Sequence, residues 1–172
     1  MQALIPPAAM PPVPGLDVPT RFYTVLPGLA GMSYPRAATP WQVLFNLGYR
    51  QIVDLTGDPP PRYDPAPLVV LERVRLQDLY GLPGPDDPEH EVEQIVAVVR
   101  LIKPVWEQGQ GIIVHCAGGT GRTGTVIGCV LRDLGYPFDE VIAYLDQLNR
   151  ARGNTGWPEA SWQAELVRDW PA

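Results

Sequence analysis

Residues 111–124, with the sequence GIIVHCAGGTGRTG, restrict the fold of this chain more than any other stretch. The stretch opens with a short apolar run rich in β-branched residues, a pattern typical of a buried strand. A glycine-rich turn follows, and the mostly apolar residues 125–131 then predict a buried helix. A strand, a tight glycine loop and a helix N-terminus together form an anion site, because the loop N–H groups converge and the helix dipole adds partial positive charge.

A cysteine and an arginine, Cys116 and Arg122, stand inside this loop with five residues between them. The guanidinium of Arg122 is a planar fork that suits phosphate oxygens. The helix dipole, the loop amides and Arg122 would all stabilise a thiolate at Cys116. A thiolate beside a phosphate cradle predicts nucleophilic attack on phosphorus.

The loop resembles the signature of the cysteine-dependent protein tyrosine phosphatase superfamily, which is His-Cys, five residues, Arg, and then Ser or Thr. His115, Cys116, Arg122 and Thr123 fill all of those positions, and the flanking strand and helix lie where the family has them. Residues 26–35, with the sequence LPGLAGMSYP, resemble more weakly the first strands of the dual-specificity type. The resemblance implies a phosphatase that forms a phosphocysteine intermediate and uses no metal or other cofactor.

Other interpretations of the loop fit less well. Residues 119–124 match the dinucleotide fingerprint G-x-G-x-x-G, but that fingerprint needs a second strand with an acidic residue about 20 positions later. A helix stop and a helix start follow here instead. A nucleoside triphosphate loop needs glycine in place of Cys116 and lysine in place of Arg122. A buried structural cysteine does not explain Arg122, and Arg122-Thr123-Gly124 at this spacing suits phosphate better than the sulfur of a rhodanese-like transferase.

The resemblance implies a role for each polar group of the loop. Cys116 is the nucleophile, and Thr123 donates a hydroxyl hydrogen bond to its sulfur. His115 fixes the loop by hydrogen bonding and is not an acid or a base. The phosphate oxygens are held by the Arg122 side chain and by the loop amides of Ala117, Gly118, Gly119, Thr120, Gly121 and Arg122.

The general acid has three candidates. In dual-specificity relatives it is an aspartate just after the strand that precedes the long helix, and Asp78 has that position. Asp86 and Asp87 lie later in the same loop, and Asp87 is also a natural N-cap for a helix that begins at Pro88. We expect Asp78 to be the acid and keep Asp86 and Asp87 as alternatives.

Strand and helix patterns alternate along the chain, which predicts an α/β three-layer sandwich with a central, mostly parallel sheet of about 4–5 strands and helices on both faces. Strands are expected in residues 21–31, 49–55, 68–76 and 111–115, and turn-forming residues occupy 56–67. A helix is expected to end at Gly48, with Thr39 as its N-cap and Pro40 at its first helical position. Another is expected from Pro88, with an end or kink at Pro104, and further helices over 123–134, 138–151 and 158–170. Trp162 and Trp170 are expected in the core, and Asp54, at a strand end, is expected to have a structural role.

The domain organisation is simple. Residues 1–19 are proline-rich and predict an extended arm or a packed strap. Residues 20–172 are long enough for one core and are interpreted as a single phosphatase domain.

Composition limits the partners. The net charge is −6 with no basic run, which disfavours a nucleic-acid or anionic-membrane partner. No apolar run reaches the roughly 18 residues of a membrane span, and residues 1–19 lack the basic start of a signal peptide. Cys116 and Cys129 do not form a disulfide framework, which fits a reducing, cytoplasmic location. We expect a monomer, with Cys129 a core residue.

The substrate is less constrained by sequence. Relatives that act on inositol lipids carry lysines inside the loop, and this loop has none. A protein phosphotyrosine is therefore the first expectation, with phosphoserine or phosphothreonine also accepted in a shallow cleft. The alternatives are a non-protein phosphomonoester, such as an inositol phosphate or a nucleotide, and a phosphate-binding module without catalysis.

Overall fold

One five-stranded sheet forms the centre of the part of the chain that the computed structural model describes, residues 1–57 and 61–171. Residues 58–60 of the predicted turn lie outside the described residues. The strand order is β1-β2-β5-β3-β4. Within the described chain, only β1 is antiparallel to its neighbour. The strands are β1 (Phe22–Leu26), β2 (Leu29–Met32), β3 (Tyr49–Asp54), β4 (Val69–Arg73) and β5 (Gly111–His115).

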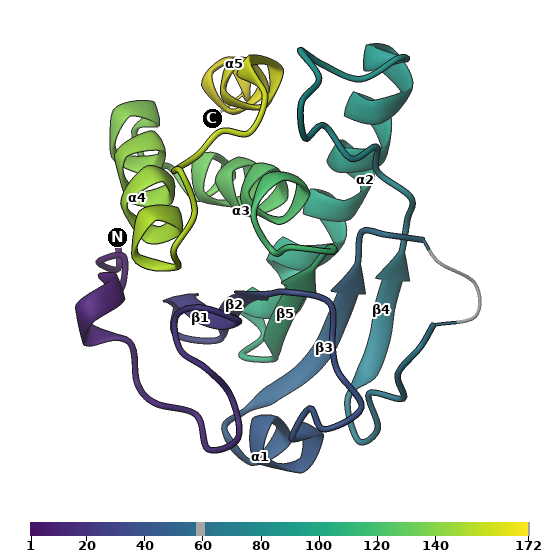
Figure 1. The fold of residues 1–172 in the computed structure, drawn as a ribbon, viewed down its shortest axis with the longest axis vertical. Helices are drawn as coiled ribbons and strands as arrows, with labels where there is room; N and C mark the ends of the chain where they lie inside the picture. The colour runs from purple at the N-terminus through teal and green to yellow at the C-terminus, as the bar shows by residue number, and fades with distance from the viewer. Residues whose placement is uncertain (58–60, 172) are drawn as a thin grey trace.

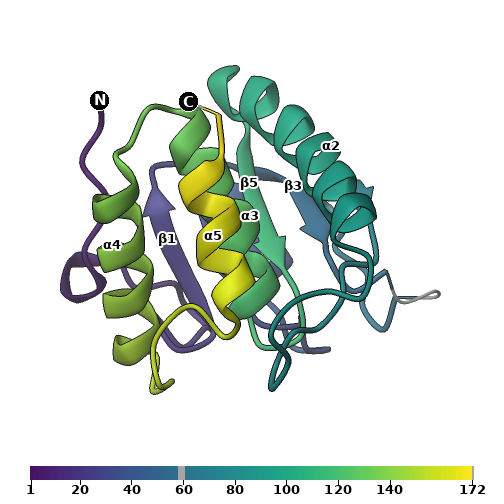
Figure 2. The ribbon, with the colours of Figure 1, turned by 90° about the horizontal axis from the view of Figure 1, so that it is seen from above.

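Helices cover both faces of this sheet (Figure 1). The helices from residue 88 onward lie on one face, as Figure 2 shows from above, and the helix at residues 41–46 lies on the other in Figure 1. The helices are α1 (Trp41–Asn46), α2 (Pro88–Glu107), α3 (Gly121–Asp133), α4 (Phe138–Ala151) and α5 (Ser161–Asp169), preceded by a short 3-10 helix, η1 (Pro7–Ala9). The predicted three-layer α/β fold with a mostly parallel sheet of 4–5 strands is confirmed. Within the described residues no helix is long and apolar enough to cross a membrane.

The position of β5 at the centre of the fold explains why its sequence is a continuous apolar run. Ile112 and Val114 are fully buried in the larger core cluster, which also contains residues of α2, α3 and α4. Ile113, between them, is buried in the smaller cluster on the α1 side, together with Trp41 and Leu44. Both faces of the strand are therefore covered, so apolar and polar residues do not alternate along it.

The start of α1 differs from the sequence prediction. The Thr39 hydroxyl accepts a hydrogen bond from the Arg36 amide at 2.9 Å, and α1 begins at Trp41 without a side-chain cap. The prediction that Thr39 caps this helix is wrong, because a short polar side chain can bond its own local turn instead of the helix.

Other element bounds differ by a few residues. The strand predicted over residues 68–76 ends at Arg73, although the amides of Val74 and Leu76 still bond to the β3 side at 2.9 and 3.1 Å. The long helix α2 continues past Pro104 to Glu107. The last helix begins at Ser161 rather than at Pro158, and residues 158–160 before it are irregular chain. Of the two predicted core tryptophans there, Trp170 is buried and Trp162 is half-buried.

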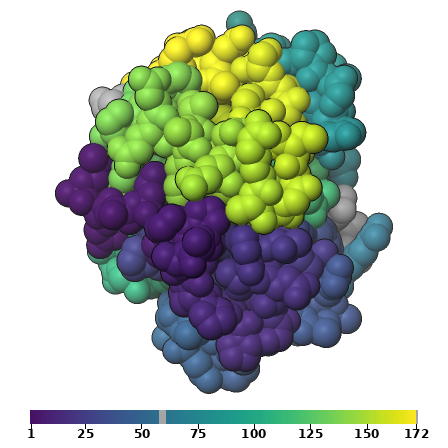
Figure 3. Space-filling model, turned by 60° about the vertical axis from the view of Figure 1, so that its left-hand side comes forward, coloured from purple at the N-terminus to yellow at the C-terminus, as the bar shows by residue number. Residues whose placement is uncertain are grey.

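The N-terminal residues lie against the sheet edge and α4 (Figure 3). The Ile5 amide donates to the Val25 carbonyl of β1 at 2.9 Å, and the Tyr144 hydroxyl of α4 donates to the Ile5 carbonyl at 2.9 Å. Met10 and Val13 are buried. Of the two predicted arrangements, the described residues of this segment therefore have the packed one.

Candidate active site

The carboxyl ends of the parallel strands meet at one edge of the sheet, and the loop after β5 lies there. His115 of β5 is in register with Asp54 of β3 and with Met32 of β2. Cys116 follows at the end of β5, and α3 begins at Gly121, so that Arg122 lies in the first turn of α3. Loops at this edge are where open α/β sheets bind ligands. The predicted strand, loop and helix are therefore present, and the helix N-terminus faces the loop.

Every carbonyl of the loop from Cys116 to Gly121 accepts a hydrogen bond from a neighbouring group. The donors to residues 116, 120 and 121 are local: His115 Nδ1, the Gly124 amide and the Thr125 hydroxyl, at 3.1, 2.9 and 2.8 Å. The donors to residues 117, 118 and 119 come from further away: the Tyr34 amide at 2.8 Å, Ser33 Oγ at 3.0 Å and Tyr23 Oη at 2.8 Å. Because the carbonyls are engaged by surrounding elements, the loop amides remain for an anion.

Gly119 is the loop position that no other residue could occupy without strain. Its φ is +71°, and an added Cβ would lie 2.6 Å from the Met32 carbonyl. This conformation lets the Gly119 amide donate to Cys116 Sγ at 3.2 Å. A backbone donor is thus aimed at the sulfur from within the loop.

Arg122 and Asp78 form an ion pair over the loop. Arg122 Nη2 lies 3.1 Å from Asp78 Oδ2, and Arg122 Nη1 contacts the Leu76 carbonyl at 3.4 Å. The Arg122 side chain is 12% exposed, whereas that of Asp78 is 57% exposed and accessible from solvent. Asp78, Cys116 and Arg122 line one cavity of about 190 Å³.

The structure separates the three acid candidates. Asp78 lies in the site, and its second carboxylate oxygen accepts from the Tyr80 amide at 3.1 Å. Asp87 caps α2, accepting from the His90 amide at 3.1 Å. Asp86 is exposed, and its amide donates to Gln77 Oε1 at 2.8 Å. Asp78 is thus the candidate that the described fold brings beside Cys116 and Arg122.

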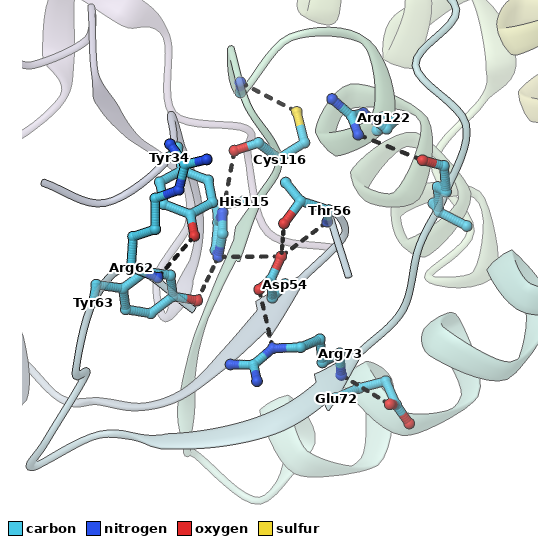
Figure 4. A network of polar contacts seen from close by, with 12 residues as sticks. Tyr34, Asp54, Thr56, Arg62, Tyr63, Glu72, Arg73, His115, Cys116 and Arg122 are labelled. Carbon is cyan, nitrogen blue, oxygen red and sulfur yellow. Dashed lines mark hydrogen bonds and ion pairs between the residues drawn. The ribbon is translucent and has the colours of Figure 1, made fainter. Parts of the chain in front are cut away.

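His115 belongs to a buried network behind the loop (Figure 4). Its Nε2 lies 2.6 Å from the Tyr63 hydroxyl, and its Nδ1 bonds the Cys116 carbonyl. Burial lowers the pKa of His115, and the neighbouring Asp54 opposes this only in part. A neutral ring that donates from Nδ1 and accepts at Nε2 matches both partners. The geometry agrees with a loop-fixing role and leaves this ring no path to a substrate.

Asp54 organises the strand end next to that network. It is fully buried, accepts from both the amide and the hydroxyl of Thr56 at 2.8 and 2.7 Å, and pairs with Arg73 at 3.2 Å. A carboxylate engaged in this way is structural, as the sequence predicts.

Thr123 differs from expectation. Its hydroxyl is buried and has no hydrogen-bond partner among the described residues. The predicted hydrogen bond from Thr123 to Cys116 Sγ is therefore absent from this structure, because the sulfur accepts from the Gly119 amide instead. The other cysteine, Cys129, is fully buried in α3, and burial raises the pKa of its thiol well above the usual value.

Several side chains at the site come from distant parts of the sequence and were not predicted. Glu159 lines the same cavity as Cys116, and an added Cβ on Gly121 would collide with its carboxylate. Burial raises the pKa of Glu159, and the nearby charge of Asp78 adds to this effect. Tyr34 and Glu91 line an adjoining cavity of about 490 Å³ with Arg122. No sequence signal marks these residues, because the contacts depend on the tertiary fold.

The fold and the site together define a class. A thiol at the end of the central strand, a loop of backbone amides and an arginine in the first helical turn are the arrangement of a cysteine-dependent phosphatase of the protein tyrosine phosphatase superfamily. Within that class, the chain belongs to the family of the Swiss Army Knife protein DSP-PTPase phosphatase domain (PTP-SAK), whose model matches residues 19–155.

Curated relatives are similar to this chain in sequence, and solved structures are similar to it in fold. The chain is 28% identical over 117 residues to "Inositol diphosphatase DSP3" of Arabidopsis thaliana, a match that covers 67% of this chain and 55% of the relative. The chain thus spans about half the length of this curated relative. Human DUSP28 has a similar fold, with a TM-score of 0.64 at 19% identity over 88% of this chain and 95% of that one. P. aeruginosa TpbA, solved in complex with pTyr, has a TM-score of 0.61 at 19% identity over 90% of this chain and 86% of that one.

Proposed function

We propose that this chain hydrolyses phosphomonoesters through a phosphocysteine intermediate, with Cys116 as nucleophile and Asp78 as general acid. The observation that supports this most strongly is the geometry around one sulfur. Cys116 Sγ accepts from the Gly119 amide, and Arg122 and Asp78 lie in the same cavity. Phosphoryl transfer needs a nucleophile, stabilisation of the equatorial oxygens and a proton for the leaving oxygen.

In the first step the Cys116 thiolate attacks phosphorus and the bond to the ester oxygen breaks. The phosphate replaces Asp78 as the partner of Arg122, and the loop amides of residues 117–122 bind the equatorial oxygens. Asp78, as the general acid, gives its proton to the leaving oxygen. The products are the alcohol and a phosphocysteine.

In the second step a water molecule attacks the phosphocysteine. The Asp78 carboxylate takes a proton from that water, and the P–S bond breaks. The Cys116 thiolate is regenerated, and inorganic phosphate leaves the site. Thr123 has a buried hydroxyl without a partner in the described structure, and this supports a role as donor to the departing thiolate. Neutral His115 keeps the loop in place through both steps.

We propose protein phosphotyrosine as the first substrate class. The open cavity beside Arg122 is lined by Tyr34 and Leu76, which offer an aromatic and an apolar wall for a phenol ring. Carboxylates are close as well: Asp78 and Glu91 line this cavity, and Glu159 lines the adjoining one. Acidic groups on both sides disfavour a substrate that carries several phosphates.

An inositol diphosphate is the second candidate, supported by the similarity to "Inositol diphosphatase DSP3" of Arabidopsis thaliana. One feature of the site supports it too, since Arg75 lines the larger cavity together with Arg122. Two guanidinium groups in one cavity can engage two phosphates. The loop itself contributes no lysine, and the one lysine of the chain, Lys103, pairs with Asp133 at 2.8 Å on α2 and α3.

The test is a panel of phosphotyrosine, phosphoserine and phosphothreonine peptides, inositol phosphates including a diphosphate, and nucleotides, assayed side by side for phosphate release. We expect the highest kcat/KM on phosphotyrosine peptides. Cys116→Ser should reduce turnover of every substrate by at least about 10³-fold, because a hydroxyl is a far weaker nucleophile than a thiolate. Cys129→Ser is the matched control and should retain turnover.

Two outcomes separate the candidates. A preference for the inositol diphosphate that Cys116→Ser abolishes would replace the phosphotyrosine assignment but keep the mechanism. Turnover that survives in Cys116→Ser would refute the mechanism itself. We also propose a cytoplasmic location, because a reducing compartment keeps free thiols such as those of Cys116 and Cys129 reduced.

A further inference from the structure

Arg152 follows α4 directly, more than 30 positions after the phosphate loop in the sequence, and its side chain contacts the carbonyl side of that loop. It is 6% exposed. Its Nη1 donates to the Gly119 carbonyl at 2.7 Å and to Thr120 Oγ1 at 3.1 Å, and its Nη2 donates to the Gly118 carbonyl at 2.8 Å. One guanidinium thus bonds three successive residues of the loop that holds Cys116.

The remaining contacts of Arg152 keep its side chain in this position. Nε donates to the Thr20 carbonyl at 3.2 Å, and Nη1 also donates to Asn149 Oδ1 at 2.8 Å. The guanidinium carbon lies 4.7 Å from the centre of the Tyr23 ring, a cation–π distance. The Tyr23 hydroxyl bonds the same Gly119 carbonyl that Arg152 bonds.

Among the described residues, no carboxylate lies within ion-pair distance of Arg152. A buried cation normally has such a partner, because removing a charge from water is costly. Here loop carbonyls and an aromatic ring take that place. Glu159, in the cavity of Cys116, is close enough to sense the Arg152 charge. The positive charge of Arg152 therefore acts on the loop and on the cavity at the other side of the loop.

These contacts determine the direction of two peptide units. The carbonyls of Gly118 and Gly119 point back toward Arg152, so the amides of the following residues point the other way. The Arg152 charge also polarises those peptides, which strengthens their amides as donors. Without Arg152, the Gly118 carbonyl would still accept a hydrogen bond from the Ser33 hydroxyl, and the Gly119 carbonyl would still accept one from the Tyr23 hydroxyl.

We infer that Arg152 is a positioning residue that holds the Gly118 and Gly119 carbonyls away from the site, so that the amide ring binds the phosphate oxygens and stabilises the Cys116 thiolate. Arg152 touches neither the substrate nor the sulfur. This inference rests on the proposed phosphatase function.

The experiment compares the full chain with Arg152→Met, Arg152→Lys and Tyr23→Phe. Arg150→Met is the matched control, because Arg150 lies two residues earlier, in the last turn of α4, is 63% exposed and pairs with Asp146. The first readout is the dissociation constant for vanadate, a phosphate mimic. The second is the pH midpoint of Cys116 alkylation by iodoacetamide. Circular dichroism reports whether each variant folds.

We expect Arg152→Met to bind vanadate about 10- to 100-fold more weakly, since small misplacements of site groups have effects of this size. The pH midpoint of Cys116 alkylation should rise, because the amides that stabilise the thiolate are no longer held and polarised by Arg152. The other charged groups near the sulfur, Asp78, Arg122 and Glu159, remain in place in this variant. Arg152→Lys retains the charge but replaces the rigid planar fork, whose two Nη atoms reach the two carbonyls separately, with one compact ammonium, so it should regain part of the midpoint and little of the vanadate affinity. Tyr23→Phe should weaken vanadate binding less than Arg152→Met does.

A folded Arg152→Met with vanadate affinity and midpoint equal to those of Arg150→Met would overturn the inference. If Arg152→Met does not fold, Arg152→Lys and Tyr23→Phe decide, and unchanged vanadate binding in both would overturn it. A wild-type chain that binds no vanadate would instead refute the proposed function. The two failures are therefore distinguishable.

Discussion

At the scale of single residues, the proton donor is the assignment that depends most on geometry. Asp78 contacts Arg122, whereas Asp87 caps a helix and Asp86 lies outside the cavity. Asp78→Asn should lower kcat about 10²- to 10⁴-fold for an alkyl phosphate, which needs a proton on its leaving oxygen. The loss should be far smaller for an aryl phosphate with a good leaving group. Steady-state kinetics over a series of leaving groups measure this.

Asp86→Asn and Asp87→Asn are the matched controls and should show no dependence on the leaving group. Equal losses on good and poor leaving groups in Asp78→Asn would assign the acid to another residue. Glu159 would then be the first to test, because its carboxylate lies in the same cavity.

At the scale of elements, α2 supports the segment that carries Asp78. The Glu91 carboxylate of α2 is 7% exposed and accepts from the Gln77 amide at 2.9 Å. Burial raises the pKa of Glu91, so the folded chain binds this proton more readily than the unfolded chain does. The resulting stability is complete at low pH and is lost as the pH rises through the folded-state pKa, which lies above 4.5.

Glu91→Gln removes this titration but keeps an oxygen that can accept from Gln77. The variant should therefore match the wild type in unfolding free energy near pH 4.5 and exceed it increasingly as the pH rises. Urea unfolding at a series of pH values measures the difference. Glu93→Gln, an exposed neighbour on α2, should show no such trend, and a Glu91→Gln difference that does not change with pH would contradict the argument.

At the scale of the whole molecule, the proline-rich N-terminal segment is part of the packed structure. Met10 is 9% exposed and belongs to the larger core cluster with residues of the sheet and of α4. Met10→Ala should reduce the free energy of unfolding by about 2 to 5 kcal/mol, because a buried methionine is replaced by a cavity. Gln2→Ala, on an exposed side chain of the same segment, should change it by less than about 0.5 kcal/mol. Equal stabilities of the two variants would show that the segment adds little to the core.

The sequence by itself determined the class of fold and the centre of the site. A buried strand, a glycine loop, a cysteine and an arginine follow one another within residues 111–124. Their relation rests on local backbone geometry: the helix dipole, the turn at Gly119 and the spacing of Cys116 from Arg122. Residues this close in sequence are kept near one another by the chain itself, so their proximity could be predicted, whereas the loop carbonyls also take hydrogen bonds from distant residues such as Tyr23 and Arg152.

Tertiary structure alone decided which distant groups complete the site. Arg152, Tyr23 and Glu159 meet the loop only because α4, β1 and the segment before α5 pack around it. The Thr39 hydroxyl also differs from its predicted role as a helix cap, since the Arg36 amide takes it as acceptor. Such contacts follow from which surfaces are buried together, and a single sequence carries no local pattern for them.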